Sequence, residues 1–566
     1  MTKQKRCTAS YKSNSDRFEA LPPTVTHPYM HQYVSIYGAR YAMLQQRCLD
    51  NVQLKNKKSI SSSSMNSSSI ETPIIPRIIE LKEGVSSIAV GTIIKTTPAR
   101  PAMDTAYHSS YEGISYLGAP YDDINGDGDK DEDEKKETKE ALSHYCSAGD
   151  TIVLEDESGR VELDLTSEMD GGYNLVTGVV VAIEGTVQAD GLMVVSAVYF
   201  PTTPPQASDE VGAEADADVD MDVDDEGEGE GEDDVNIMFL SGLDCGGTDA
   251  TLSLKRELLV DFLTGHFSPG QGSNIARVII AGGGCTKPTR PAGMVPYGDW
   301  NASANSSKSN DKEKEKSEDD VTLPIRELDL FLGELCAAGI PVDYIPGLHD
   351  PTNANWPQKP LHACLLPNAT CFVNMLTRCT NPYDAIIGGK EFIGSDGMNI
   401  ADLKRYVSKQ NDSISTALDE DIDEDDVDEN GNIVVPSAPL NKSSGGNALR
   451  SFTSVEALEL ALKFNHIAPT GPDSLPTFPF KDNDPFVFET TPHVFFAGNC
   501  NEYESKIVEQ KNSDESKKTL LLCVPSFALT GQAVMINLKS LKCTIVEFGD
   551  LPKSPLGAGG EKHMEE

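Results

Sequence analysis

Acidic residues between positions 123 and 134 are spaced as a cation-binding loop would require. The segment Asp123–Glu134 matches the ligand positions of an EF-hand calcium loop, with Gly128 at the sharp turn. Lys130 stands where an aliphatic residue is usual, the preceding Gly113–Tyr121 holds Gly and Pro and cannot form an entering helix, and no second loop pairs with it. We therefore expect a solvated acidic loop, with calcium binding as the open alternative.

Glycine clusters and cysteines could support two other kinds of chemistry. The glycine clusters are at 246–247, 282–284 and 445–446. None is followed by the Lys-Ser/Thr of a phosphate loop, so we expect turns. The twelve cysteines include no Cys-x-x-Cys pair, and Cys364, Cys371 and Cys379 have the wrong spacing for a tight zinc knuckle. We expect reduced, mostly buried thiols of an intracellular protein, and neither a metal nor a cofactor.

The most informative residues follow a predicted buried strand, at Gly347-Leu348-His349-Asp350. They resemble the Gly-Asn-His-Asp/Glu box of calcineurin-like metallophosphoesterases. In that family, Asp, His and Asn side chains at several strand ends hold two metal ions, which activate a water molecule. Within this resemblance, Leu348 replaces the Asn ligand, whereas His349 and Asp350 remain.

The other ligand positions of the same family are also altered. The first box, Asp-x-His, falls on Gly242 and Asp244, and the bridging carboxylate of the second box falls on Gly283. The last box, Gly-His-x-His, has Asn499 and Asn501 in place of both histidines. Because glycine and leucine side chains offer no metal ligand, the resemblance implies the phosphoesterase fold without a catalytic or metal site.

The net charge of −42 is unevenly distributed over the 566 residues. The runs 209–234, 419–429 and 122–134 contribute −15, −9 and −7. Such runs cannot bury enough apolar surface to fold, so we expect disorder there. The remainder is mildly acidic, which argues against strong autonomous binding to DNA phosphates. The polar start of the chain and the lack of a long apolar run predict neither a secretory signal nor a membrane span.

The elements that position these residues fall into two groups. Apolar residues at helical spacing predict a helix over about residues 29–53. Residues 86–96 favour a strand, and 151–165 and 175–200 favour hairpins, the second turning at Asp190-Gly191. About five short strands of this kind suit a small closed barrel such as an OB-fold.

Beyond residue 234, buried strands alternate with helices. Strands are expected over 235–240, 276–281 and 342–345, and helices over 252–263, 323–338 and 452–464. Four further strands are expected at 494–497, 519–524, 533–537 and 544–548. This alternation predicts an α/β layer sandwich with a mixed sheet.

The expected fold class is therefore α/β and β, with an N-terminal helix and OB-fold barrel followed by a calcineurin-like phosphoesterase sandwich. The expected segments are a disordered N-terminus at 1–28, the helix and OB-fold domain at 29–201 with an insertion at 104–148, an acidic linker at 202–234, the phosphoesterase-like domain at 235–550 with insertions at 286–321 and 411–450, and a disordered tail at 551–566.

Several segments outside the insertions carry a more specific resemblance. They are Gln32–Arg40, Pro341–Asn353, Pro357–His362, Thr380–Tyr383, Phe392–Asn399, His466–Asp473, Asp484–Phe486 and His493–Asn499. Together they resemble the B-type subunits of eukaryotic replicative DNA polymerases, and specifically the small subunits of the delta type.

That resemblance implies a nuclear, non-catalytic scaffold in DNA replication and repair synthesis. In the family, the barrel and phosphoesterase domains present one surface to the cysteine-rich C-terminal domain of the polymerase delta catalytic subunit and another to the third subunit. DNA is then contacted mainly through the complex, and neither membrane association nor a homo-oligomer is expected. Trp356 and Tyr503, which lie in predicted loops, are candidate contact residues.

Two alternatives belong to other functional classes. The first is a residual metal-dependent phosphodiesterase that uses Asp244, His349 and Asp350. The second is a single-stranded DNA-binding module formed by the barrel, whose affinity would fall steeply with salt.

Overall fold

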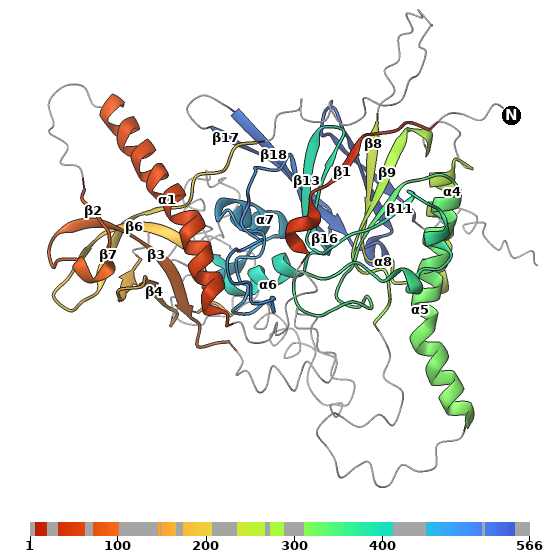
Figure 1. Ribbon diagram of the computed structural model, residues 1–566, viewed down its shortest axis with the longest axis horizontal. Helices are drawn as coiled ribbons and strands as arrows, with labels where there is room; N and C mark the ends of the chain where they lie inside the picture. The colour runs from red at the N-terminus through yellow and green to blue at the C-terminus, as the bar shows by residue number, and fades with distance from the viewer. Residues whose placement is uncertain are drawn as a thin grey trace, which may run out of the picture.

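The structure is a computed structural model, and it describes residues 6–19, 32–62, 72–100, 145–147, 149–165, 174–206, 235–266, 272–287, 311–410, 449–511 and 516–549. The three acidic runs, the calcium-like loop, Gly445-Gly446 and the tail 551–566 lie outside these residues. The described part forms a barrel with one long helix, at the left of Figure 1, and a two-sheet sandwich at the centre and right.

The barrel confirms the OB-like fold expected for the first part of the chain. Its strands are β2 (Ile74–Ile75), β3 (Ser86–Thr96), β4 (Thr151–Glu155), β5 (Arg160–Asp164), β6 (Val180–Val187) and β7 (Met193–Tyr199). They lie in the order β2-β3-β4-β5-β7-β6, and antiparallel pairing of β3 with β6 closes the barrel. Both expected hairpins form, and Gly191 has the positive φ that the turn between β6 and β7 requires.

Helix α1 (Val34–Ser62) lies across one side of the barrel (Figure 1). It begins five residues later than the expected helix and extends nine residues further. Leu44, Cys48 and Val52 are fully or almost fully buried against β3, β6 and β7. Burial of this apolar stripe, rather than helix propensity alone, fixes α1 on the barrel.

The sandwich has two six-stranded sheets. The first has the order β1-β12-β13-β16-β18-β17, and its strands are β1 (Tyr11–Ser13), β12 (Tyr383–Ile387), β13 (Lys390–Ser395), β16 (Val494–Cys500), β17 (Glu504–Lys511) and β18 (Ser516–Pro525). The second has the order β11-β10-β9-β8-β19-β20, and its strands are β8 (Asn236–Leu240), β9 (Ile275–Ala281), β10 (Val342–Ile345), β11 (Leu376–Arg378), β19 (Gln532–Asn537) and β20 (Cys543–Glu547).

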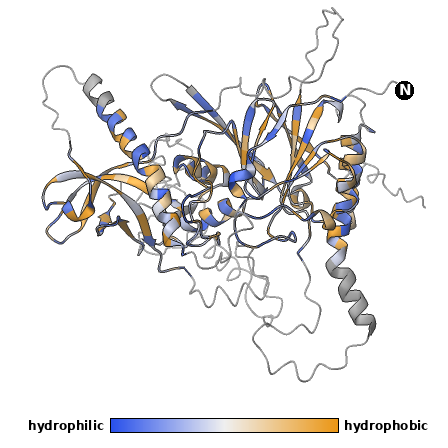
Figure 2. Ribbon diagram, viewed as in Figure 1, coloured by the Kyte–Doolittle hydropathy of each residue, from blue (hydrophilic) through white to orange (hydrophobic). Residues whose placement is uncertain are grey.

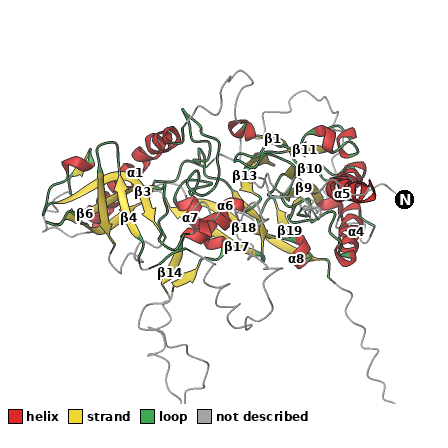
Figure 3. Ribbon diagram, turned by 90° about the horizontal axis from the view of Figure 1, so that it is seen from below, coloured by secondary structure: helices red, strands yellow, loops and turns green. Residues whose placement is uncertain are grey.

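Apolar side chains fill the space between the two sheets, among them Phe239, Phe392 and Phe496, all fully buried. Figure 2 shows hydrophobic residues along strands of the barrel and of both sheets. The sheets are covered by α4 (Ala250–Thr264), α5 (Asp311–Ala337), α6 (Met398–Tyr406), α7 (Ser454–Lys463) and α8 (Phe527–Thr530). In Figure 3, α4 and α5 lie at one end of the molecule, and α6 and α7 lie between the first sheet and the barrel.

One hydrophobic core runs without interruption from the barrel into the layer of α6 and α7. Leu154 and Val181 of the barrel belong to the same buried cluster as Leu403 of α6 and Leu458 of α7. A small sheet of β14 (Ser408–Gln410) and β15 (Leu449–Ser451) lies beside these helices. Barrel and sandwich therefore share a continuous apolar core.

Regular structure occurs in three segments where it was not expected. The N-terminal region 1–28, expected to be disordered, contains β1, which pairs with the edge strand β12, and a 3-10 helix, Ser15–Phe18. Helix α5 begins at Asp311, inside the expected insertion 286–321, and β15 begins inside the expected insertion 411–450. Local composition predicts polar segments in all three places, and the pairing of β1 with β12 depends on residues about 370 positions away.

Candidate functional site

The strand ends of the sandwich bring most of the predicted site residues together. Gly242 follows β8, Gly283 follows β9, and Leu348 and His349 follow β10. The amide of Gly242 donates to the carbonyl of Gly282 at 2.9 Å, and the amide of Asp244 donates to Gly283 at 3.1 Å. Asn499, near the end of β16, joins the same group, whereas Asn501 is an exposed residue beyond that strand.

Gly242 and Gly283, where the resemblance places metal ligands, have no space for a side chain. A Cβ atom at Gly283 would lie 2.5 Å from the Asn499 amide oxygen and 2.8 Å from the Gly242 Cα atom. A Cβ atom at Gly242 would lie 2.3 Å from the Ser526 hydroxyl oxygen. Both residues also have positive φ angles, +68° and +61°, which disfavour any side chain. A carboxylate at either position would require Asn499 or Ser526 to move.

Asn499 links the strand ends by hydrogen bonds. Its backbone amide donates to the Ser241 hydroxyl at 2.9 Å, and its side-chain amide donates to the Asp396 carbonyl at 2.9 Å. It adopts a positive φ of 49°, which asparagine tolerates better than most residues. Where the resemblance places a metal-binding histidine, the protein therefore has an asparagine whose backbone and side chain together join the ends of β8, β13 and β16.

The two retained residues of the third box differ in their surroundings. The Asp350 carboxylate accepts from the amides of Gly347 at 2.7 Å and Cys285 at 2.9 Å, so both of its oxygens hold the loop backbone. His349 is half-buried, and burial together with nearby Lys287 lowers its pKa, although Asp350 and Asp244 oppose this shift. His349 is therefore neutral at pH 7. Leu348 is partly exposed and provides no ligand.

One carboxylate at this edge was not singled out from the sequence. Asp396 follows β13, is fully buried, and accepts from the Asn381 side chain at 2.8 Å and the Met398 amide at 3.2 Å. Burial raises its pKa to about 7, against the opposing effect of these hydrogen bonds. The available signal was the Gly-Ser-Asp-Gly sequence at the end of a strand, which marks Asp396 as a strand-end residue.

The donor set does not fit the two metal ions that the fold family implies. Within the described ranges, no three His, Cys, Asp or Glu side chains lie close enough to hold a metal ion. The oxygens of Asp350 are already used by backbone amides, and Asn499 and Ser526 occupy the space beside Gly242 and Gly283. We therefore derive no chemical step through a metal at this edge.

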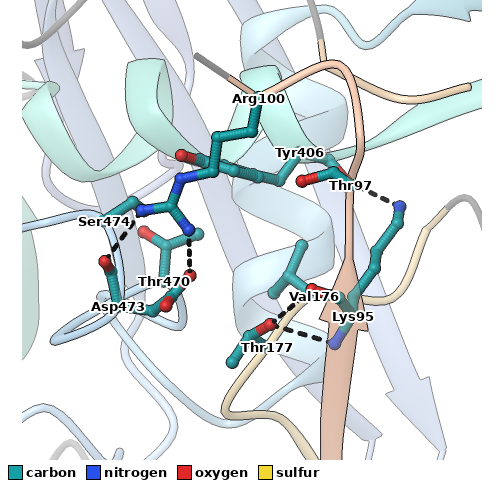
Figure 4. Close-up of a pocket in the computed structure, with 9 residues that line it drawn as sticks. All are labelled: Lys95, Thr97, Arg100, Val176, Thr177, Tyr406, Thr470, Asp473 and Ser474. Atoms are coloured by element: carbon teal, nitrogen blue, oxygen red, sulfur yellow. Dashed lines mark hydrogen bonds and ion pairs between the residues drawn. The ribbon is translucent and has the colours of Figure 1, made fainter. Parts of the chain in front are cut away.

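The second polar region lies between the barrel and the sandwich (Figure 4). A small cavity there is lined by residues of both parts, including Lys95, Arg100, Thr177 and Asp473. The Lys95 ammonium donates to the Tyr406 carbonyl at 3.0 Å and lies 3.4 Å from the Asp150 carboxylate. Arg100 pairs with Asp473 at 2.9 Å. Because both cations already have acidic partners, the cavity is a poor site for an anionic ligand.

Arg40 of α1 makes the most deeply buried contact of this interface. Its guanidinium lies 2.7 Å from the Asp484 carboxylate and donates to the carbonyls of Gly178 in the barrel at 3.1 Å and Gly471 at 2.6 Å. The Asp484 carboxylate also lies 2.9 Å from the His466 ring. These contacts join α1, the barrel and the sandwich at one point that water does not reach.

The electrostatics of this triad follow from its burial. Burial and the neighbouring Arg40 lower the pKa of His466 to about 4, although Asp484 opposes the shift. Burial alone would raise the pKa of Asp484, but Arg40 and His466 hold it well below its usual range. At neutral pH, the triad therefore contains a cationic Arg40, an ionised Asp484 and a neutral His466.

One expectation about loop aromatics is wrong. Trp356, proposed as an exposed contact residue, is fully buried and lies 6.1 Å from the ring of Phe486, in the core shared by barrel and sandwich. Tyr503 is half-buried, and its hydroxyl lies 2.8 Å from that of Ser505. A tryptophan in a proline-rich segment is packed into the core here.

Comparison with known proteins agrees with both halves of the fold. A family described as "DNA polymerase delta subunit OB-fold domain" matches residues 32–198, and a family of B-type subunits of DNA polymerases alpha and epsilon matches residues 237–506. The DNA polymerase delta small subunit of Oryza sativa subsp. japonica is 30% identical over 84% of this chain and 86% of its own length. The Arabidopsis thaliana small subunit is 29% identical over 83% and 84%, and DNA polymerase delta subunit 2 of Drosophila melanogaster is 26% identical over 92% and 94%.

An OB-fold barrel joined to a two-sheet α/β sandwich, matched by these two families, defines the class of B-type accessory subunits of replicative DNA polymerases. Within that class, the chain belongs to the family of DNA polymerase delta small subunits. No helix in the described part of the chain is long and apolar enough to cross a membrane.

Proposed function

We propose that this protein is a nuclear, non-catalytic scaffold of DNA polymerase delta, which bridges the cysteine-rich C-terminal domain of the catalytic subunit and the third subunit. The observation that carries the non-catalytic part is the occupied space at Gly242 and Gly283, where Asn499 and Ser526 lie in place of ligands. The proposed degenerate positions are Gly242, Asp244, Gly283, Leu348, His349, Asn499 and Asn501.

A rigid connection between barrel and sandwich supports the scaffold part of the proposal. The buried triad at Arg40 and the shared apolar core hold the two parts in a fixed arrangement. A bridging subunit needs such rigidity. Two partners bound to separate surfaces stay in a fixed arrangement only if the two surfaces are themselves fixed relative to each other. Exposed apolar side chains occur on both parts, including Ile79 on the barrel and Val373 on the sandwich, as protein interfaces require.

The non-catalytic part is tested with the purified full chain. We expect no hydrolysis of bis-p-nitrophenyl phosphate above the buffer rate in the presence of Mn²⁺. Manganese-dependent hydrolysis that is abolished by His349→Ala would overturn the proposal and establish the phosphodiesterase alternative based on Asp244, His349 and Asp350. Hydrolysis that His349→Ala does not affect would identify a contaminating enzyme, and repurification would then decide the test.

The scaffold part is tested by purifying this chain from cells of its own organism and identifying the bound proteins. We expect the polymerase delta catalytic subunit and the third subunit, both lost when the sandwich is unfolded by substitution in its core. Recovery of neither subunit with a folded chain would contradict the proposal.

DNA contact is proposed to be mainly indirect, through the complex. The single-stranded DNA alternative predicts that the full chain alone binds a fluorescent oligonucleotide at low salt, with affinity that falls steeply as salt rises. We expect no such binding, and a steep salt dependence would favour the alternative.

A further inference from the structure

Two exposed cysteines lie in the segment that connects β10 to β11. Cys364 and Cys371 are both exposed, and the other ten cysteines are buried or half-buried. Burial raises the pKa of Cys336 to about 11 and of Cys245 to about 12, so these buried thiols remain protonated at neutral pH. Cys364 and Cys371 are therefore the two cysteines most accessible to a dissolved reagent.

The two exposed thiols have different hydrogen-bond partners. The Cys371 sulfur lies 3.0 Å from the carbonyl oxygen of Pro367, which can accept a hydrogen bond but cannot take up the proton. The Cys364 sulfur lies 2.9 Å from Nδ1 of His362. Imidazole is the side chain best suited to remove a proton near neutral pH, so only Cys364 has a base beside it.

The tautomer of His362 follows from a second contact. His362 is the N-cap of the short 3-10 helix Ala363–Leu365, and its Nδ1 accepts the backbone N–H of Cys364 at 3.3 Å. Because Nδ1 accepts a hydrogen bond, it carries a lone pair and no proton. In a neutral imidazole the ring proton is then on Nε2. The same lone pair faces the Cys364 sulfur, so the thiol donates and the imidazole accepts.

The backbone on either side holds this pair in place. Leu361 is buried in the core of the α4 and α5 side of the sandwich, and its carbonyl accepts from the guanidinium of Arg378 at 2.8 Å. Leu366, after the short helix, is fully buried. The exposed His362 and Cys364 are thus held between the buried residues Leu361 and Leu366. The cationic side chain of Arg378 contacts the residue that precedes His362.

We propose that Cys364, activated by His362, is a modification site that exchanges with small-molecule disulfides of the glutathione type. The thiol proton moves from Sγ to Nδ1 of His362 as the sulfur attacks one sulfur of the disulfide. A new S–S bond forms, the original S–S bond breaks, and the released thiolate recovers the proton from the imidazole. One thiol and one disulfide give one mixed disulfide and one free thiol, so no further oxidant is required.

The nearby Arg378 favours an anionic disulfide such as glutathione disulfide over a neutral one. The Cys364–His362 pair is separate from the strand-end site. It lies in the chain segment that leaves β10 and uses none of the residues Gly242, Asp244, Gly283, Leu348, His349, Asn499 or Asn501. The proposal is therefore independent of the proposed function and can fail or succeed separately.

The test uses the full chain and measures modification of each cysteine by peptide mass mapping. With limiting iodoacetamide at neutral pH, we expect Cys364 to react at least about tenfold faster than Cys371, the benefit of a positioned base being of this order or larger. His362→Asn keeps a side chain that can cap the short helix but removes the base, and should lower the Cys364 rate by about tenfold without affecting Cys371. With glutathione disulfide, we expect a mixed disulfide in the wild type and in Cys371→Ser, and none in Cys364→Ser.

Equal rates at the two cysteines, or an unchanged Cys364 rate in His362→Asn, would overturn the proposal. Unchanged thermal unfolding of each variant confirms that the rates compare folded proteins. If His362→Asn unfolds locally, the wild-type ratio of Cys364 to Cys371 still decides the question, because both thiols are measured in one sample. A faster reaction with glutathione disulfide than with an uncharged disulfide identifies Arg378 as a contributor, and equal reaction with both restricts the proposal to the Cys364–His362 pair.

Discussion

The strand-end edge of the sandwich and the interface between sandwich and barrel are both rich in polar groups, but they use them differently. At the strand ends, Gly242 and Gly283 leave no room for a side chain, and the Asp350 carboxylate binds backbone amides. At the interface, Arg40, Asp484 and His466 form a charged group buried from water. The strand-end carboxylate thus holds loop backbone, whereas the interface carboxylate pairs with charged and ring side chains from other elements.

This difference indicates which constraint shapes each region. A catalytic edge must leave space for substrate and metal, whereas a structural junction must satisfy every buried charge. At the strand ends, a Cβ atom at Gly242 or Gly283 would meet Ser526 or Asn499, and both oxygens of Asp350 accept backbone amides. The interface meets the structural requirement, because each nitrogen of the Arg40 guanidinium has an acceptor.

The largest effect is expected from breaking the interface triad. Arg40→Ala leaves the Asp484 carboxylate buried beside His466 without its cation, and we expect a loss of about 3–5 kcal/mol in the free energy of unfolding. Urea denaturation of the variant and the wild type measures this loss of unfolding free energy. The matched control is Arg160→Ala, which removes an exposed ion pair with Glu155 and should change the urea midpoint very little. Equal effects of the two substitutions would show that the buried triad stabilises the protein no more than a surface ion pair does.

A smaller but substantial effect is expected at the closed edge. Gly283→Ala places a Cβ atom 2.5 Å from the Asn499 side chain at a positive φ, and should cost about 3 kcal/mol. Gly159→Ala, in the hairpin turn between β4 and β5, is the control because a Cβ atom there meets no atom within 4 Å. Tolerance of Gly283→Ala in a thermal melt would mean that the edge has more room than its packing indicates.

The pH dependence of the triad should be weaker than the effect of removing it. His466 has a folded-state pKa of about 4, below its ordinary value of 6.5, so the unfolded chain binds the proton more readily. Stability should therefore be complete above pH 6.5 and fall as the pH decreases toward 4, by on the order of 2 kcal/mol. Urea midpoints between pH 7.5 and 4.5 measure this slope, and His466→Gln should reduce it. A slope of opposite sign would show that His466 is charged in the folded protein.

The substitution with the smallest expected effect is at Asp396, and the pH dependence of this group has the opposite sign to that of His466. Its pKa of about 7 in the folded protein lies above its ordinary value of 3.8, so the folded state binds the proton more readily. Its contribution to stability is complete below pH 4 and is lost as the pH rises toward 7. Asp396→Asn keeps an acceptor oxygen for Asn381 without the buried charge, and should raise stability at pH 8 by about 1 kcal/mol. Thermal unfolding of Asp396→Asn and the wild type at pH 5 and pH 8 tests this prediction. Lower stability of the variant than of the wild type at pH 8 would contradict it.

The regular elements could be predicted from the sequence because their signals are local. Alternating apolar residues and the Asp190-Gly191 turn identify the barrel hairpins, and continuous apolar runs identify β8, β9 and β10. The positions of Gly242, Gly283 and Leu348 at strand ends could also be predicted, because each follows one of those strands by a few residues. The contacts of Ser526 and Asn499 beside the two glycines could not, because these residues come from distant parts of the chain.

The features that escaped prediction depend on distant partners. Arg40 lies in one of the segments that carry the family resemblance, but its role requires Asp484, more than 400 residues later. The sequence places Trp356 in a loop, and only its contact with Phe486 in the structure shows that it belongs to the core. The exchange site proposed at Cys364 needed only His362, two residues away, yet spacing alone does not show that the two side chains face each other.

The pairing of β1 with β12 has a consequence for the order in which the chain can fold during synthesis. Tyr11 lies opposite Ile387, so β1 is synthesised more than 370 residues before its partner strand exists. Until then, the apolar side chain of Phe18, which is buried in the finished protein, has no core to enter. The outer edge of the first sheet is therefore completed only after β12 is made, by a segment that was synthesised long before it.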